Sequence, residues 1–304
     1  MTPPAGAGTE VDVGGRRLKL SNLDKVLYPE AAFTKGQVID YYARIAPVLV
    51  PHLAGRALTR RRWPDGVAGP GFYEKNCPSH RPPWVDTVRV DAHREPVEYC
   101  VVNDVAVLVW LANLAALELH PSLSRAEHLG RPTTLVFDLD PGPPAAMAEC
   151  AWLATELRAL FGELGLESCP KTSGSKGLQV YVPLNAPVDY EATSGFALAV
   201  ARRLEARFPD RVVSNMTKAR RTGKVLVDWS QNSPGKTTVS VYSLRARPRP
   251  TVSTPVTWEE VEGVVEDGDL SFEASEVVER VGRLGDLFEP VLTLQQQLPP
   301  PPDP

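Results

Sequence analysis

The stretch TTLVFDLDPGP (residues 133–143) closes an apolar run with two aspartates and then turns at Pro and Gly. Its β-branched residues and the turn that follows predict a β-strand. Because side chains alternate across a strand, Asp138 and Asp140 would share one face while Leu139 points to the other. Two carboxylates this close stay ionised together when a cation lies between them, and Mg²⁺ and Mn²⁺ prefer such oxygen ligands. The pair predicts a divalent-metal site, with an ordinary strand end as the alternative.

Two further segments carry groups suited to phosphate chemistry. GKVLVDWSQN (residues 223–232) places Asp228 on a second predicted strand, and three carboxylates from two strands suit a two-metal site for in-line phosphoryl or nucleotidyl transfer. Between the strands lies KTSGSKGLQVYVPL (residues 171–184), in which residues 173–177 offer hydroxyls, backbone N–H groups and one ammonium group, that of Lys176, which together fit a triphosphate. This segment lacks the spacing of a Walker loop, and a plain flexible turn is the alternative interpretation.

The composition is that of a globular chain, with 304 residues of which 43% are hydrophobic and 23% charged. The formal net charge is -4, so a polyanionic partner must be met by local basic clusters. Such clusters are present at residues 60–62, 218–224 and 245–249, with a solvated basic surface as the alternative for each. The four cysteines form no C-x-x-C pair, which predicts neither a zinc knuckle nor a disulfide framework and favours a reducing cytoplasm. No signal peptide and no membrane span are predicted.

Apolar periodicity and turn residues divide the chain into helices and strands. Helices are predicted over residues 34–55, 103–119, 145–165 and 193–209, and strands over 133–140, 178–184 and 224–230. This alternation favours an α/β or α+β fold. The small and Pro/Gly-rich residues 1–16 and the proline-rich residues 291–304 are expected to be flexible tails.

Four stretches occur in this order along the chain: LVFDLDPG, TSGSKGL, KVLVDWSQNSPGKTT and VYSLRARP. Together they strongly resemble the primase-like polymerase domain of bacterial ligase D, a member of the archaeo-eukaryotic primase superfamily. The resemblance extends upstream through LSNLDKVLYPEAAFTKGQVIDYYARIAPVLVPHLAGR and AALELHP, and covers roughly residues 17–290. It implies a primase-like catalytic core with a mostly antiparallel central sheet flanked by helices. The expected domain divides into an N-terminal lobe, residues 17–130, and a catalytic lobe, residues 131–290.

The resemblance also implies roles for individual residues. Asp138, Asp140 and Asp228 would be catalytic and hold two Mg²⁺ or Mn²⁺ ions. The incoming nucleotide would be bound by His120, Ser173, Lys176, Gln179, Gln231, Lys236 and Arg245. Lys25 and Lys35 would grip the 5′-phosphate of a downstream DNA strand, and Phe72 or Tyr73 would stack on a template base. This set is physically coherent, because phosphates need ammonium groups and unpaired bases need aromatic faces.

The implied function is template-directed addition of NTPs or dNTPs, with ribonucleotides preferred, to a primer 3′-hydroxyl at gaps or broken DNA ends. End joining and short-gap repair would be its setting, with Ku and a DNA ligase as candidate partners. The implied location is the bacterial cytoplasm, in association with the nucleoid.

One departure from the family pattern concerns Gln179, which stands where the family normally has histidine. Glutamine donates a hydrogen bond but carries no positive charge, so weaker nucleotide affinity or a changed metal dependence is expected. In the extreme, the chain would be a weakly catalytic or non-catalytic relative that binds 5′-phosphorylated DNA ends. A haloacid-dehalogenase-like phosphatase is a further alternative, although that family expects Thr or Val where Gly142 stands and this chain continues Pro-Gly-Pro.

Overall fold

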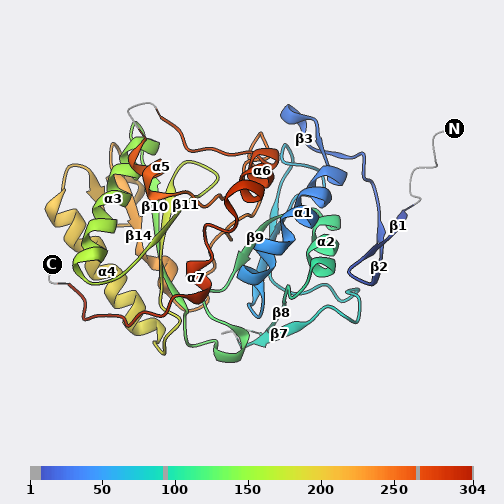
Figure 1. The fold of residues 1–304 in the computed structure, drawn as a ribbon, viewed down its shortest axis with the longest axis horizontal. Coiled ribbons are helices and arrows are strands. Elements are labelled where there is room, and N and C mark those ends of the chain that lie inside the picture. The colour runs from blue at the N-terminus through green and yellow to red at the C-terminus, as the bar shows by residue number, and fades with distance from the viewer. Residues whose placement is uncertain (1–7, 92–94, 265–267, 303–304) are drawn as a thin grey trace. The chain divides into compact units, whose positions relative to one another are not determined.

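The computed structural model describes residues 8–91, 95–264 and 268–302 (Figure 1). The chain divides into two units. The first comprises Met1–Pro121, Val239–Val252 and Phe272–Gly285. The second comprises Ser122–Thr238, Ser253–Ser271 and Asp286–Pro304. Two late segments of the chain therefore belong with its first part, while the predicted domain limits stay a prediction.

A five-stranded sheet forms the centre of the second unit. Its strands, in spatial order, are β11 (Cys169–Thr172), β12 (Leu178–Pro183), β10 (Thr134–Pro141), β14 (Val225–Asp228) and β13 (Val212–Val213). Every pairing in it is antiparallel except that of β13 with β14. The predicted mixed α/β class with a mostly antiparallel central sheet is therefore confirmed.

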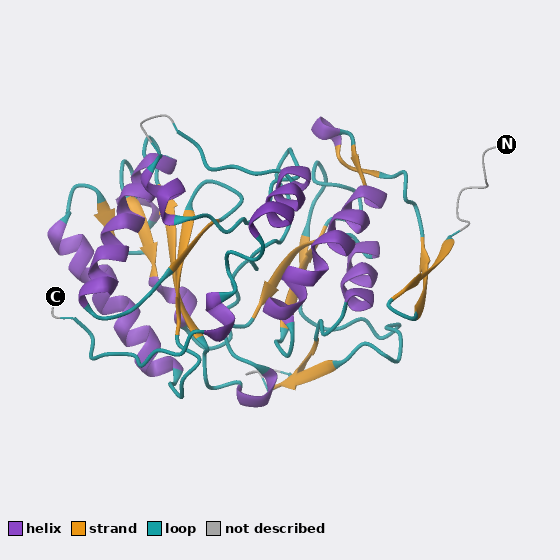
Figure 2. Ribbon diagram, in the orientation of Figure 1, coloured by secondary structure: helices purple, strands orange, loops and turns teal. Residues whose placement is uncertain are grey.

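One face of this sheet is covered by helices, shown in purple in Figure 2. Leu135, Phe137 and Leu139 of β10 are fully buried, and the ring of Phe137 lies 5.2 Å from that of Phe161 in α3. Because these residues alternate with Asp138, the aspartate side chain is left to the opposite face. The helices of the unit are α3 (Met147–Glu163), α4 (Tyr190–Arg207), α5 (Trp258–Glu262) and α7 (Pro290–Thr293), with short 3₁₀ turns η2 (Ala126–His128), η3 (Lys218–Arg220) and η4 (Trp229–Asn232).

The first unit contains the long helix α1 (Lys35–Leu53), which begins where the sequence predicts. Thr34 accepts a hydrogen bond from the backbone N–H of Gln37, and the Gln37 side chain accepts one from the Thr34 backbone, so the two form a capping box. The other helices of the unit are α2 (Val105–Asn113), α6 (Ala274–Leu284) and the 3₁₀ turn η1 (Pro29–Ala31).

The predicted helix 103–119 is wrong in its second half. Asp104 caps α2 as predicted, but the helix ends at Asn113 because Ala115 adopts a left-handed conformation with φ of 57°. The following residues form strand β9 (Ala116–Pro121), which pairs with β5 (Leu58–Arg62). This difference matters because β9 carries one of the predicted site residues.

The remaining strands of the first unit make one larger sheet and two small hairpins. The larger sheet has the order β6 (Phe72–Glu74), β5, β8 (Val97–Cys100) and β7 (Thr87–Val90), with β9 also paired to β5. The hairpins are β1 (Thr9–Val13) with β2 (Arg16–Leu20) and β3 (Val26–Tyr28) with β4 (Phe33–Thr34).

Both expected tails contain ordered contacts. Strand β1 starts at Thr9 within the expected N-terminal tail. At the other end, the backbone N–H of Gln296 donates to the carbonyl oxygen of Leu184, and its side-chain amide donates to that of Pro183. No helix among the described residues is long and apolar enough to cross a membrane.

Cys77 and Cys100 form a disulfide, which the cysteine spacing does not predict. They are 23 residues apart in sequence, but the bridge between Asn76 and Tyr99 pairs their neighbours across the sheet. The guanidinium of Arg60 contacts the sulfur of Cys100. Strand pairing of this kind cannot be read from cysteine spacing, which is why the sequence pattern missed it.

Candidate active site

Three acidic side chains meet at one end of the central sheet of the second unit. Asp138 and Asp140 lie on β10 with one residue between them, and Asp138 is the direct cross-strand partner of Asp228 on β14. Cross-strand partners point to the same face, so all three carboxylates share the face opposite the buried residues of β10. Asp138 and Asp228 are half-buried and Asp140 is exposed.

The Asp228 carboxylate is oriented by the 3₁₀ turn η4. It accepts hydrogen bonds from the backbone N–H of Ser230 at 3.0 Å, from the Ser230 hydroxyl at 2.6 Å and from the Gln231 side-chain amide at 2.9 Å. Gln231, predicted to contact the nucleotide, is therefore bonded to a predicted metal ligand.

The electrostatics of Asp138 indicate crowded negative charge. Burial, followed by the charge of Asp140 and with a smaller contribution from Asp228, raises the pKa of Asp138 to about 7. Among the described residues, no three His, Cys, Asp or Glu side chains are arranged to ligate one metal ion. The donor set nevertheless fits a hard divalent cation, because carboxylate oxygens are its preferred ligands and the cation would offset the repulsion that raises the Asp138 pKa.

A lysine that the sequence reasoning did not select lies beside this acidic cluster. Lys171 of β11 donates hydrogen bonds from Nζ to Oε1 of Gln179, at 2.5 Å, and to the Ser253 hydroxyl, at 2.6 Å. Gln179 in turn is hydrogen-bonded to the Asp138 carboxylate. The signal that could have found Lys171 is its position directly before the predicted loop, on a strand that pairs with β12.

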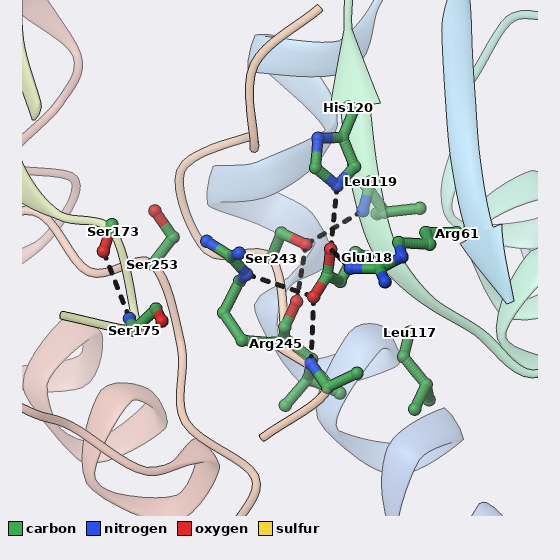
Figure 3. Close-up of polar contacts among 12 residues, drawn as sticks. Arg61, Leu117, Glu118, Leu119, His120, Ser173, Ser175, Ser243, Arg245 and Ser253 are labelled. Atoms are coloured by element: carbon green, nitrogen blue, oxygen red, sulfur yellow. Dashed lines mark hydrogen bonds and ion pairs between the residues drawn. The ribbon is translucent and has the colours of Figure 1, made fainter. Parts of the chain in front are cut away.

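The loop between β11 and β12 is closed by Ser173. Its hydroxyl accepts hydrogen bonds from the backbone N–H groups of Ser175 and Gly177, both at 3.2 Å (the bond to Ser175 is drawn in Figure 3). A Cβ on Gly177 would lie 1.9 Å from the carbonyl oxygen of Leu139, so only glycine lets the loop lie this close to β10. Lys176 is exposed at the loop tip and lines a cavity of about 610 Å³ beside the start of α3. Lys236 is also exposed.

In the first unit, His120 and Arg245 are joined through Glu118, another residue that the sequence reasoning missed (Figure 3). Glu118 accepts hydrogen bonds from Nε2 of His120 at 3.0 Å, from Nε of Arg245 at 3.2 Å and from the backbone N–H of Ala246 at 3.1 Å. Burial on its own would raise the pKa of Glu118, but the hydrogen bond from His120 and the charge of Arg245 lower it to about 2. Burial lowers the pKa of His120, against the opposing effect of Glu118.

Lys25 and Lys35 lie together because the backbone N–H of Lys35 donates to the carbonyl oxygen of Lys25. Lys25 is exposed and forms an ion pair of 2.9 Å with Asp65. Lys35 is buried, and its Nζ donates to the carbonyl oxygen of Ser21 at 2.7 Å. Burial, and then the charges of Lys25 and Arg62, lower the pKa of Lys35 to about 8.

Phe72 and Tyr73 of β6 are two of the few large hydrophobic side chains exposed in the described residues, at 46% and 61%. Each lies near an arginine of β5, because the guanidinium of Arg62 is 5.4 Å from the Phe72 ring and that of Arg61 is 5.0 Å from the Tyr73 ring. Exposed aromatic rings beside cations are typical of surfaces that bind unpaired bases.

Comparisons with known proteins give matches to a single family. The model of the LigD primase-polymerase domain matches residues 34–288. The multifunctional non-homologous end joining protein LigD of Mycolicibacterium smegmatis is 45% identical over 277 residues, covering 90% of this chain and 36% of that protein. The bifunctional LigD of Bacillus subtilis is 32% identical over 273 residues, covering 90% of this chain and 44% of that protein. The chain thus spans less than half the length of these curated relatives.

Among solved structures, the polymerase domain from Mycobacterium tuberculosis ligase D in complex with DNA matches with a TM-score of 0.86 and 42% identity. The match covers 92% of this chain and 99% of that one. The similarity therefore extends over nearly the whole of a solved domain.

Proposed function

The chain belongs to the LigD primase-polymerase domain family, and on that premise we propose that it extends a primer 3′-hydroxyl at gaps or broken DNA ends by template-directed addition of nucleotides. The predicted family and the nucleotidyltransferase class are confirmed by the same comparisons. They leave no support for the phosphatase alternative.

The observation that carries the proposal is the placement of Asp138, Asp140 and Asp228 on one face of adjacent antiparallel strands. These carboxylates would hold two Mg²⁺ or Mn²⁺ ions, which supply Lewis-acid stabilisation of phosphate charge when bound. In the reaction, the primer 3′-hydroxyl loses its proton to solvent and its oxygen forms a bond to the α-phosphorus of the NTP. The bond from that phosphorus to the bridging oxygen breaks, and pyrophosphate leaves. The chain contributes position and charge.

The proposed nucleotide contacts fall in both units. In the second unit they are Ser173, Lys176, Gln179, Gln231 and Lys236. Of these, Lys176 and Lys236 present exposed ammonium groups that suit phosphate oxygens. In the first unit they are His120 and Arg245, which Glu118 holds by hydrogen bonds. A preference for ribonucleotides belongs to this proposal, with His120 as the contact near the sugar.

The proposed DNA contacts lie in the first unit. Lys25 and Lys35 would bind the downstream 5′-phosphate, and Phe72 or Tyr73 would stack on a template base. DNA with a gap or broken end and a 5′-phosphate is the proposed substrate. For end joining, we propose Ku and a DNA ligase as partners. The proposed location is the cytoplasm, in association with the nucleoid.

Primer extension on a gapped duplex with a downstream 5′-phosphate tests this function. Wild type and Asp138→Ala are compared with each of Mg²⁺ and Mn²⁺ and with rNTPs and dNTPs. The polymerase function is supported if the wild type adds the nucleotide complementary to the template base and Asp138→Ala does not. The relative rates with rNTPs and dNTPs give the sugar preference. Intact DNA binding with no addition by the wild type would instead favour the non-catalytic end-binding relative.

A further inference from the structure

We propose that Lys171 is a positioning residue for the Asp138 carboxylate and acts through Gln179. The proposal deepens the polymerase function above and rests on it. Four strands place side chains in one cross-strand row, because Lys171 on β11 is opposite Gln179 on β12, Gln179 is opposite Asp138 on β10, and Asp138 is opposite Asp228 on β14. Direct cross-strand partners share a face, so the row runs continuously from an ammonium through an amide to two carboxylates.

The donors and acceptors in this row fix the orientation of the Gln179 amide. An ammonium has donors only, so the bond from Nζ of Lys171 must be accepted by Oε1 of Gln179. The NH₂ group of Gln179 is then the part left to meet the Asp138 carboxylate, to which Gln179 is hydrogen-bonded. Without Lys171 the Gln179 amide could rotate by about 180° and point its oxygen at the Asp138 carboxylate. The two oxygens would then repel each other.

The position of Lys171 is itself fixed from several sides. The side chain is fully buried, and its Nζ also donates to the Ser253 hydroxyl and lies 5.4 Å from the centre of the Tyr181 ring. The Ser253 hydroxyl in turn donates to the carbonyl oxygen of Thr172 at 2.8 Å. These contacts hold the Lys171 ammonium in one position beside Gln179.

This arrangement also explains how glutamine can stand in the position where the family resemblance implies histidine. An imidazole could accept from Lys171 through one ring nitrogen and donate to Asp138 through the other. Glutamine makes the same two bonds with its oxygen and its NH₂ group. Lys171 would therefore set the orientation of the amide when the residue is glutamine and the tautomer of the imidazole when it is histidine. Partners of metal ligands commonly have this role.

The test is a double-mutant cycle read out as Mn²⁺ affinity, with no DNA or nucleotide present. Lys171→Met, Gln179→Leu and the double variant are titrated with Mn²⁺ while electron paramagnetic resonance follows the free ion. Each single variant is expected to bind Mn²⁺ roughly 10–100-fold more weakly, and the double variant no more weakly than Gln179→Leu alone. Wild-type affinity in Lys171→Met, or losses that add in the double variant, would overturn the proposal.

The direction of the change in Mn²⁺ affinity distinguishes a positioning role of Lys171 from an effect of its charge alone. Removing a positive charge near a cation site would by itself tighten Mn²⁺ binding, so weaker binding must come from the lost orientation. Lys218→Met removes an exposed lysine of the same unit and is the charge-matched control, expected to leave the affinity unchanged. If Lys171→Met does not fold, the proposal is tested by comparing the Mn²⁺ affinities of Gln179→His and Gln179→Leu. Histidine can make both hydrogen bonds and should keep the wild-type affinity, whereas leucine can make neither and should weaken Mn²⁺ binding. Equal affinities in these two would refute the proposal.

The polymerase function and this inference can fail separately. Primer extension by the wild type reports on the function, whereas the Mn²⁺ cycle reports on the row of side chains alone. Extension by a wild type whose Mn²⁺ affinity is insensitive to Lys171 would leave the function standing and remove the positioning role.

Discussion

Glu118 and His120 lie two residues apart on β9, and the buried Glu118 carboxylate accepts a hydrogen bond of 3.0 Å from Nε2 of His120. Residues i and i+2 of a strand point to the same face. The other oxygen of Glu118 accepts from Nε of Arg245, 127 residues away in the sequence. One carboxylate thus holds two side chains proposed to contact the nucleotide, and fixes which nitrogen of His120 carries a proton.

Replacing Glu118 by glutamine should therefore weaken nucleotide use. The amide of the variant would retain one acceptor oxygen where the carboxylate uses two, so His120 and Arg245 could not both keep their bonds. The loss of a hydrogen bond to a charged group predicts a KM for the NTP that is roughly tenfold higher or more. Steady-state extension on gapped DNA measures it.

The matched control for Glu118→Gln is Glu10→Gln, which changes an exposed residue of the same unit. An unchanged KM in Glu118→Gln would show that His120 and Arg245 do not depend on Glu118.

The elements around the acidic cluster could be read from the sequence because they are governed by local alternation. Leu135, Phe137 and Leu139 are buried and alternate with Asp138 and Asp140, which a period of two predicts. Helix α1 can likewise be predicted from the sequence, since Thr34 and Gln37 form a capping box between residues close in the chain.

Lys171 and Glu118 could not be selected in this way, because their importance comes from pairing between strands. Lys171 meets Gln179 only through the register of β11 with β12, and Glu118 meets Arg245 from a distant segment. The Cys77–Cys100 bridge depends on strand pairing in the same manner. Apolar periodicity also continued past Asn113, and only the left-handed backbone at Ala115 shows that the helix stops there.

Binding of the 5′-phosphate should weaken as the pH rises through about 8. The pKa of Lys35 is lowered to about 8, so its ammonium is charged at pH 7 and loses its proton at higher pH. Fluorescence anisotropy of a gapped duplex with a 5′-phosphate, measured from pH 7 to pH 9, should show affinity falling by up to about tenfold as one charged contact is lost.

Two controls identify Lys35 as the source of this pH dependence. A duplex with a 5′-hydroxyl should show a much smaller change, because the phosphate is missing. Lys35→Arg should flatten the profile, since a guanidinium stays charged throughout this range. A profile that keeps its slope in Lys35→Arg would assign the titration to another group.

Reduction of the Cys77–Cys100 disulfide should lower the stability of the first unit. The bridge closes a segment of 23 residues and restricts the unfolded chain, which predicts a stabilisation on the order of 3 kcal/mol. Thermal unfolding with and without a phosphine reductant measures this difference. The double variant Cys77→Ser/Cys100→Ser should unfold at the temperature of the reduced wild type and be indifferent to reductant; an indifferent wild type would mean that the bridge does not form in solution.

Tyr73, rather than Phe72, should be the residue that stacks on a template base. Across β6, β5 and β9, Tyr73 is opposite Arg61 and Arg61 is opposite Glu118, so Tyr73 shares a face with Glu118. The Tyr73 ring lies 6.0 Å from that of His120. Phe72 precedes Tyr73 on the strand and therefore points to the other face.

Tyr73→Ala should consequently weaken binding of a gapped duplex by about 1–3 kcal/mol, the contribution of stacking on one base, whereas Phe72→Ala should change it less. Tyr73→Phe keeps the ring and should bind as the wild type does. The comparison is made by anisotropy on a duplex with one unpaired template base and on a fully paired duplex, where neither variant should matter. A larger loss in Phe72→Ala than in Tyr73→Ala would place the template on the opposite face of β6.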